Sequence, residues 1–308
     1  MKKNVPGLSC GRYPTEEIFA AYSKAGIEAM ELSLMGEGEY ARLGLEAERI
    51  CAMAKHYGVE LWSMHLPFGR ETMNFCAPDA EVRAETMRAQ LENLRVAHSL
   101  GIKNVVVHGG IPLPQTERKK YFAIARENVA ALQNEASRFG ITVCVENLMP
   151  SCIGRNSEEL LSLLSAHPDL RVCLDPNHLL GESHSALIYA LAGKIVTTHI
   201  SDYDFLEERH WMPGEGKIDW PRLVAALKEV GYSGPFLYEL SPWKTPNTIE
   251  RRALTLEDYK ENYLSLIEEK MPIAIGNPKK EICEEKTFAN FCLQTYKITY
   301  ENLMVETI

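Results

Sequence analysis

The apolar residues of this chain fall into short runs that alternate with longer amphipathic stretches. Several of the runs are rich in β-branched residues and begin directly after a glycine, and these glycines are Gly26, Gly58, Gly101, Gly140 and Gly193. A glycine just past a helix supplies the left-handed residue that ends it. A following run that is apolar throughout is typical of a strand buried on both faces of a parallel sheet. The pattern therefore predicts alternating helices and parallel strands.

Eight such strands are expected along the chain. They lie near residues 5–10, 27–33, 59–65, 103–108, 141–146, 171–175, 194–200 and 234–239. An open doubly wound sheet would usually carry a glycine-rich phosphate loop after its first strand, and the segment GLSCGRYP is not one. Eight units therefore favour a closed (β/α)₈ barrel, the TIM barrel of the α/β class, over residues 1–270. Residues 271–308 break the pattern and form a C-terminal extension of unknown role, for which an oligomer contact is one interpretation.

The expected helices carry start signals that support this division. Asn156 is followed three residues later by Glu159 and reads as the first residue of a capping box. Asp219 precedes a Trp-Pro pair, which places a proline in the first helical turn. Asp79 opens a long helix that is expected to run to about Leu100.

Seven of the strand segments end in, or carry, a side chain that can bind a metal ion. These side chains are Glu31, His65, His108, Glu146, Asp175 with His178 close behind it, His199 and Glu239. In a (β/α)₈ barrel the active site is built at the C-terminal ends of the strands, which all meet at one face. The chain is therefore expected to carry a carboxylate–imidazole metal site on that face.

Four of these residues come from neighbouring strands and are expected to share one ion. Glu146, Asp175, His199 and Glu239 follow the fifth to the eighth expected strands. Three carboxylates and one imidazole form a hard, oxygen-rich site that suits Mn²⁺, Mg²⁺ or Co²⁺ and also tolerates Zn²⁺. Any one of the four could be an ordinary polar residue at a strand end, but four in succession favour metal binding.

Four further histidines form a second set, and these are His65, His108, His178 and His210. A lone histidine after an apolar strand is often a structural residue, and the alternatives here are a hydrogen bond to substrate or an additional metal. The remaining histidines that read as structural are His56, His98, His167 and His184. In the loop after the seventh strand, Trp211 is a candidate apolar lid over the ligand, and Glu31 is a residue that could border the pocket.

The alternation of side chains along a strand also predicts what lies beneath the site. The residue two positions before a strand-end group lies on the same face, below it. These residues are all small, and they are Ser63, Val106, Cys144, Cys173 and Thr197. The barrel is therefore expected to hold a pocket above a narrow plug of side chains.

Composition narrows the classes of partner and of cellular location. The chain has 308 residues, 24% of them charged and 45% hydrophobic, and its net charge is −9. That charge disfavours a nucleic-acid surface, because phosphate binding depends on clustered Lys and Arg. No stretch approaches the roughly 18 apolar residues of a membrane span. Eight cysteines without a CxxC pair, and a start that lacks the apolar run of a signal peptide, predict a cytoplasmic protein.

At these residues the chain resembles the xylose isomerase-like TIM-barrel superfamily, which includes sugar epimerases, inosose-processing enzymes and the endonuclease IV type of apurinic endonuclease. The resemblance covers roughly residues 5–270, and its motifs are VENL at Glu146, LDPNH at Asp175 and His178, TTHISD at His199, HWMPGEGKIDW, and GPFLYEL at Glu239. The PGEG-x-IDW string together with the strand-end carboxylates is specific for the superfamily and not for a substrate.

The resemblance implies roles for single residues. Glu146, Asp175, His199 and Glu239 match the metal ligands of the one-metal sugar epimerases, whose two glutamates also form the acid/base pair and whose histidine matching His178 contacts substrate. The endonuclease IV group adds the positions that match His65, His108, His178 and His210 and holds three zinc ions. Where those endonucleases usually have Asp-x-His, this chain has Glu208-Arg209-His210.

The function expected from these observations is a divalent-metal-dependent sugar or sugar-phosphate isomerase or epimerase, with Mn²⁺ as the first choice of ion. A divalent ion would stabilise an enediolate, and Glu146 and Glu239 would remove and return the proton. The expected partner is a small-molecule sugar, and neither a nucleic acid nor a membrane is expected as a partner. The sequence is compatible with a homo-oligomer. The alternatives are an inosose-type dehydratase on the same metal site, a zinc-dependent apurinic endonuclease, and a non-catalytic sugar-binding barrel.

Overall fold

The computed structural model describes residues 4–34, 38–69, 71–112, 114–179, 181–240 and 245–279. Eight parallel strands form one sheet in the order β7-β6-β5-β4-β3-β2-β1-β8. They are β1 (Pro6–Cys10), β2 (Ala29–Leu32), β3 (Glu60–His65), β4 (Asn104–Val107), β5 (Thr142–Glu146), β6 (Arg171–Leu174), β7 (Ile195–Thr198) and β8 (Phe236–Tyr238). Each lies where the sequence predicts it.

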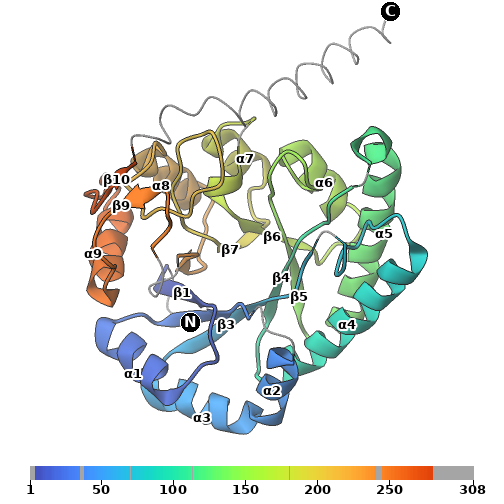
Figure 1. Cartoon of the computed structure of the whole chain (residues 1–308), viewed down its shortest axis with the longest axis horizontal. Coiled ribbons are helices and arrows are strands. Elements are labelled where there is room, and N and C mark those ends of the chain that lie inside the picture. Colours follow the sequence, from blue (N-terminus) through green and yellow to red (C-terminus); the bar gives the residue numbers. More distant parts are fainter. Residues whose placement is uncertain are drawn as a thin grey trace, which may run out of the picture.

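The two edge strands of this sheet meet and close the barrel. Ile200, just past β7, forms a parallel bridge with Tyr238 of β8. Its N–H donates to the Leu237 carbonyl at 2.6 Å, and its own carbonyl accepts from the N–H of Glu239 at 3.2 Å. The expectation of a (β/α)₈ barrel is therefore confirmed, and the helices surround the strands as a ring (Figure 1).

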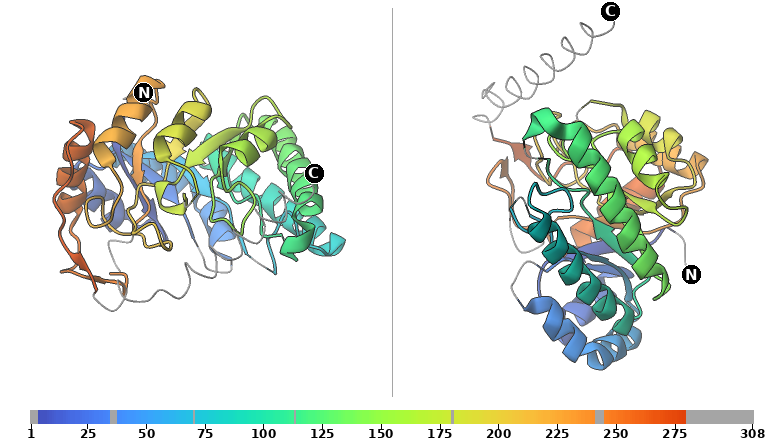
Figure 2. Two further views of the ribbon diagram at one scale, coloured as in Figure 1. Left: turned by 90° about the horizontal axis from the view of Figure 1, so that it is seen from above. Right: turned by 90° about the vertical axis from the view of Figure 1, so that its right-hand side faces the viewer.

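The helices follow the strands in chain order. They are α1 (Glu16–Ala25), α2 (Glu39–Leu45), α3 (Ala47–Tyr57), α4 (Ala80–Ser99), α5 (Arg118–Ser137), α6 (Ser157–Leu164), α7 (His184–Ala190), α8 (Trp220–Glu229) and α9 (Leu256–Ile267), with short 3₁₀ turns at Gln115–Glu117 and Pro176–His178. Consecutive helices pack side by side on the outside of the strands, for example α4 against α5 (Figure 2). Within the described residues, no helix is both long and apolar enough to cross a membrane.

The start and stop signals act locally as expected, with one difference. Gly26 ends α1 in the left-handed region at a φ of 76°. Asp79 and Asp219 cap α4 and α8 by accepting backbone N–H groups. Asn156 caps α6 in the same way, but the Glu159 carboxylate accepts from two N–H groups outside the helix instead of completing the capping box. Glu159 of the first turn of α6 therefore holds the loop that precedes the helix.

The inside of the barrel is plugged by small side chains. Val106, Cys144 and Cys173 are fully buried and form a cluster separate from the main core, with Val196 packed against them. The main core lies instead between the strands and the surrounding helices. The alternation of side chains therefore runs as the sequence predicts. The residue two positions after each of these points to the same side of its strand, nearer the C-terminal face.

The loop after β7 is held by one buried carboxylate. Asp202 accepts the N–H groups of Tyr203, Gly214 and Ile218 and the indole N–H of Trp220, at 2.8 to 3.2 Å. A side chain at Gly216 would place its Cβ 2.2 Å from the Asp202 carboxylate, so only glycine fits there. Residues of the PGEG-x-IDW string thus fix the conformation of this loop through their contacts with Asp202.

The segment after β8 packs back on the same loop. Arg251 and Glu215 form a buried ion pair, with Nη1 2.9 Å from Oε2. Strand β9 (Ile249–Glu250) pairs antiparallel with β10 (Asn277–Pro278). The start of the expected extension, residues 271–279, is therefore attached to the barrel, and residues 280–308 lie outside the described residues.

Candidate metal centre

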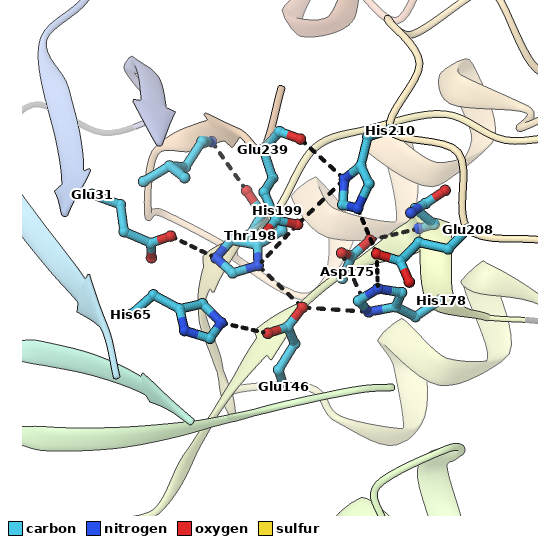
Figure 3. A network of polar contacts seen from close by, with 12 residues as sticks. Glu31, His65, Glu146, Asp175, His178, Thr198, His199, Glu208, His210 and Glu239 are labelled. Atoms are coloured by element: carbon cyan, nitrogen blue, oxygen red, sulfur yellow. Dashed lines mark hydrogen bonds and ion pairs between the residues drawn. The ribbon is translucent and has the colours of Figure 1, made fainter. Parts of the chain in front are cut away.

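Four strand ends converge on the C-terminal face of the barrel. Glu146 is the last residue of β5, Asp175 and His199 follow β6 and β7, and Glu239 follows β8. One ligand atom of each lies within 4.8 Å of those of the other three. Asp175 and His199 are fully buried, Glu146 is 1% exposed, and the Glu239 side chain is 24% exposed. The structure thus brings together the four residues expected to share an ion (Figure 3).

Glu146 is the hub of the site, because both of its oxygens face histidines. Oε1 lies 3.1 Å from Nδ1 of His199 and 3.3 Å from Nδ1 of His178. Oε2 lies 3.2 Å from Nε2 of His65 and 3.1 Å from Nε2 of His108. A single carboxylate therefore connects the two sets of residues that the sequence singles out.

A second group of potential ligands lies beside the first. His178, Glu208 and His210 also offer ligand atoms within 4.8 Å of one another. Oε1 of Glu208 is 2.5 Å from Nε2 of His210 and 3.5 Å from Nε2 of His178. All four histidines of the second expected set therefore border the site, and Glu208 occupies the position where the sequence departs from Asp-x-His.

Three of these histidines have a fixed orientation. Each donates Nδ1–H to a backbone carbonyl, in the pairs His65 to Leu66 at 2.9 Å, His178 to Asn147 at 3.0 Å and His210 to Glu239 at 3.1 Å. A carbonyl oxygen only accepts, so in the neutral ring Nε2 carries the lone pair. That lone pair faces a carboxylate, which is unfavourable unless a second proton or a metal cation lies between them.

Two buried oxygens of the site have no hydrogen-bond partner among the described residues. They are Oδ2 of Asp175 and Oε2 of Glu239. The other Asp175 oxygen accepts the N–H of Asn177 at 2.7 Å. A buried acceptor without a partner is destabilising by about 1–3 kcal/mol, and more when it is charged. Free oxygens and inward-facing imidazole nitrogens together fit a divalent cation held by carboxylates and histidine.

The residue after Glu146 holds the neighbouring candidate ligand, Asp175, in place. The Asn147 side chain accepts from the Asp175 N–H at 2.7 Å and donates to its carbonyl at 2.6 Å. The amide thus continues the β5–β6 pairing beyond the last backbone bonds and fixes the position of Asp175. The asparagine stands in the VENL motif, but its role depends on the pairing of β5 with β6, which the motif does not indicate.

Two further residues lie at the site, outside the two sets that the sequence singles out. Glu31 of β2 is fully buried and lies 3.0 Å from Nε2 of His199. Phe68, which follows the third strand, is 40% exposed, and its ring centroid lies 3.8 Å from that of His108. In the sequence, Glu31 lies near the end of a buried strand, as the candidate ligands do, and Phe68 is an aromatic residue three positions after His65.

The expectation of a tryptophan lid is wrong for Trp211. Its side chain is fully buried, its indole N–H donates to Thr248 at 2.9 Å, and its backbone pairs with Asp202. An indole held on all sides is part of the base of the loop. Among the histidines that read as structural, His184 donates Nε2–H to the Pro176 carbonyl at 2.9 Å, which supports the turn after Asp175.

The clustered charges shift the pKa values of the metal-free site. Burial raises the pKa of Asp175 to about 8, and the charges of Glu239 and Glu146 act in the same direction. Burial opposes the charged form of His210, but the hydrogen bond to Glu208 and the charge of Glu239 outweigh it and raise its pKa to about 9. The surrounding histidines outweigh burial at Glu146 and hold its pKa well below the usual range.

These shifts predict that the metal-free protein loses stability as the pH rises from about 6.5 to 9. The folded protein keeps protons on Asp175 and His210 that the unfolded chain releases, near pH 4 and 6.5 respectively. The protonated Asp175 stabilises the fold fully below about pH 4, and this stabilisation is lost as the pH rises through about 8. The protonated His210 does so below about pH 6.5, and its stabilisation is lost as the pH rises through about 9. Thermal unfolding at several pH values, with and without Mn²⁺, measures the effect.

Bound Mn²⁺ should flatten this pH dependence, because a metal replaces the protons. His210→Gln should reduce the slope of the metal-free protein. A metal-free unfolding temperature that stays constant or rises between pH 6.5 and 9 would contradict the interpretation.

Comparisons with known proteins agree with the fold. A family model described as "Xylose isomerase-like TIM barrel" matches residues 19–258. The 2-oxo-tetronate isomerase of Pectobacterium atrosepticum is 27% identical, covering 52% of this chain and 63% of the relative. The D-psicose 3-epimerase of Ruminiclostridium cellulolyticum is 22% identical, covering 70% and 75%. The crystal structure of a D-tagatose 3-epimerase-like protein superposes with a TM-score of 0.70 at 20% identity, covering 86% of this chain and 98% of that one.

Proposed function

The chain belongs to the xylose isomerase-like TIM-barrel family, and on that premise we propose that it is a divalent-metal-dependent sugar isomerase or epimerase. The observation that carries the proposal is the convergence of Glu146, Asp175, His199 and Glu239 within 4.8 Å. The names of the relatives, which include sugar epimerases and isomerases, support the same class of substrate. Mn²⁺ is the first choice of ion, because three of the four ligands are carboxylates.

The four residues would hold the ion through their inward-facing oxygens and Nδ1 of His199. When bound there, a divalent cation polarises the carbonyl and the neighbouring hydroxyl of a sugar and stabilises the negative charge that develops when a proton leaves the carbon. The cation would favour the ionised form of Asp175 and of the glutamate that acts as the base, even in a dry site.

Glu146 and Glu239 are the proposed acid/base pair. They enter the site from β5 and from the end of β8, so they approach a bound sugar from different sides. One carboxylate accepts the proton and the other, protonated, returns a proton to the opposite face, which inverts the carbon. Oε2 of Glu239 makes no hydrogen bond within the part of the chain that the structure describes, so it is available to accept a proton.

The surroundings of the pair suit a sugar. His178 and His210 present ring nitrogens on one side of the site, where Glu208 already bonds to His210. Phe68 presents a partly exposed ring on the other side, against His108. The polar side chains can form hydrogen bonds with the hydroxyl groups of a sugar, and the aromatic ring can pack against its C–H groups.

A substrate screen with added Mn²⁺ tests the proposal. The substrates are free ketopentoses and ketohexoses, their phosphates, 2-oxo-tetronate and inosose, with products separated by chromatography. Interconversion of an epimer or an aldose–ketose pair is the expected result. Loss of water from inosose with no epimer formed would instead assign the chain to the lyases.

A second candidate function is metal-dependent phosphodiester hydrolysis, which the His178–Glu208–His210 group favours because it offers a further ligand set. The net charge of −9 opposes it, because DNA binding requires a basic surface. Incubation with abasic duplex DNA and Zn²⁺ or Mn²⁺ at physiological salt is expected to give no cleavage. Robust metal-dependent nicking, with all the sugars left unchanged, would reverse the ranking of the two classes.

A further inference from the structure

His199 differs from the other oriented histidines of the site in the partner that its ring holds. His65, His178 and His210 each donate to a backbone carbonyl. His199 instead has Nε2 3.0 Å from Oε1 of Glu31, which is a fully buried carboxylate. The opposite nitrogen, Nδ1, faces Glu146 at 3.1 Å and Glu239 at 3.6 Å.

Glu31 reaches His199 across the inside of the barrel, because one belongs to β2 and the other follows β7 (Figure 3). The pairing of β2 with β3 explains how this carboxylate is held. The register shifts after Met30, so that Glu31 lies opposite Ser63. A bulge of this kind re-aims a side chain relative to the regular ladder.

Ser63 uses one of the two Glu31 oxygens. Its hydroxyl donates to Oε2 at 2.7 Å, and Oε1 is left for His199. A hydroxyl can donate only one proton, and a carboxylate only accepts. The direction of both bonds is therefore determined: Ser63 donates to Glu31, and the imidazole donates Nε2–H to Glu31.

The consequence lies on the other side of the ring. With the proton on Nε2, the neutral imidazole of His199 has its lone pair on Nδ1, directed at Glu146 and Glu239. A carboxylate behind a metal-binding histidine fixes the ring and makes the free nitrogen a stronger donor than a carbonyl does. The charge of Glu31 also adds to the attraction for a cation, with little screening at a buried position.

We propose that Glu31, held by Ser63, is a positioning residue that makes Nδ1 of His199 the metal-binding nitrogen and strengthens it as a ligand. The inference rests on the proposed metal centre and not on the identity of the sugar. Glu31 itself does not contact the ion or the substrate in this scheme, because its oxygens are both engaged.

Calorimetric titration of Mn²⁺ into the metal-free protein tests the strength of the ligand. Glu31→Ala is expected to raise the dissociation constant about 10–100-fold. Glu31→Gln should have a smaller effect, because its amide oxygen still accepts from Nε2–H while the charge is lost. Glu60→Gln is the matched control, since Glu60 is an exposed carboxylate at the other end of the adjacent strand β3, and its constant should equal that of the wild type.

Nuclear magnetic resonance of protein with ¹⁵N-labelled histidine tests the orientation of the ring. Long-range ¹H–¹⁵N spectra identify the protonated nitrogen, and His199→Asn assigns the signal. With Mg²⁺ as a diamagnetic ion, His199 should carry its proton on Nε2, whereas His65, His178 and His210 should carry it on Nδ1. A proton on Nδ1 of His199 would overturn the inference.

The outcomes separate this inference from the proposals on which it rests. A purely structural Glu31 would lower the unfolding temperature of the metal-free variant and leave the Mn²⁺ constant of the folded protein within about twofold of wild type, which would overturn the inference alone. Failure of the wild type to bind Mn²⁺, Mg²⁺, Co²⁺ or Zn²⁺ would overturn the metal centre and this inference together. Metal binding without turnover of any sugar would overturn the proposed activity and leave this inference standing.

Discussion

Replacement of Glu239 by glutamine is expected to reduce the formation of epimer by about 10²–10⁴-fold, even at saturating Mn²⁺. Glutamine keeps the size of the side chain and one oxygen, but it cannot accept a proton. Among the described residues Oε2 of Glu239 makes no hydrogen bond, so the change removes a base without breaking one. The fold should therefore persist, as circular dichroism can verify.

Solvent deuterium exchange separates the role of this glutamate from that of its partner. If Glu239 serves one face of the carbon only, Glu239→Gln should still incorporate deuterium from the face served by Glu146, with no epimer formed. Glu146→Gln should show the converse, although it also weakens the metal, since Glu146 faces several ligands at once. Glu250→Gln, on the exposed side of β9, is the control that should keep wild-type turnover.

Unchanged turnover in either variant at saturating metal would remove that glutamate from the acid/base role. It would then remain at most a ligand. The same experiment would also show which glutamate acts on which face, because each variant loses exchange from one face only.

Removal of divalent metal is expected to abolish turnover and to lower the unfolding temperature. A ligand that binds only the folded chain stabilises it by about 2.7 kcal/mol at a concentration 100 times its dissociation constant. The effect should be reversible, because the four candidate ligands stand at or just past the ends of paired barrel strands. Chelation, dialysis and addition of Mn²⁺, followed by activity and thermal unfolding, measure both changes.

Asp175→Asn provides the matched variant for this prediction. Asp175 has no proton to move in the proposed reaction, and its N–H and carbonyl stay bonded to Asn147. Higher Mn²⁺ should therefore restore most of its turnover, in contrast to Glu239→Gln. Full activity of the wild type after complete chelation would refute the metal dependence.

The sequence alone determined the elements of this protein and the face on which its candidate metal ligands meet. The glycine after each helix and the apolar run that follows are local signals, because a helix end requires a left-handed residue and a parallel strand is buried on both sides. Because parallel strands end at one face, the sequence is enough to group Glu146, Asp175, His199 and Glu239.

The tertiary structure decided which atoms meet. The contact from Glu31 to His199 crosses the barrel and depends on a register shift between β2 and β3 that no local pattern announces. Trp211 reads as a lid in the sequence, yet the path of the loop around Asp202 buries it. Hydrophobic periodicity records which face of an element is buried, whereas side-chain direction across a barrel depends on register and loop path, which are set only when the strands pair and the barrel closes.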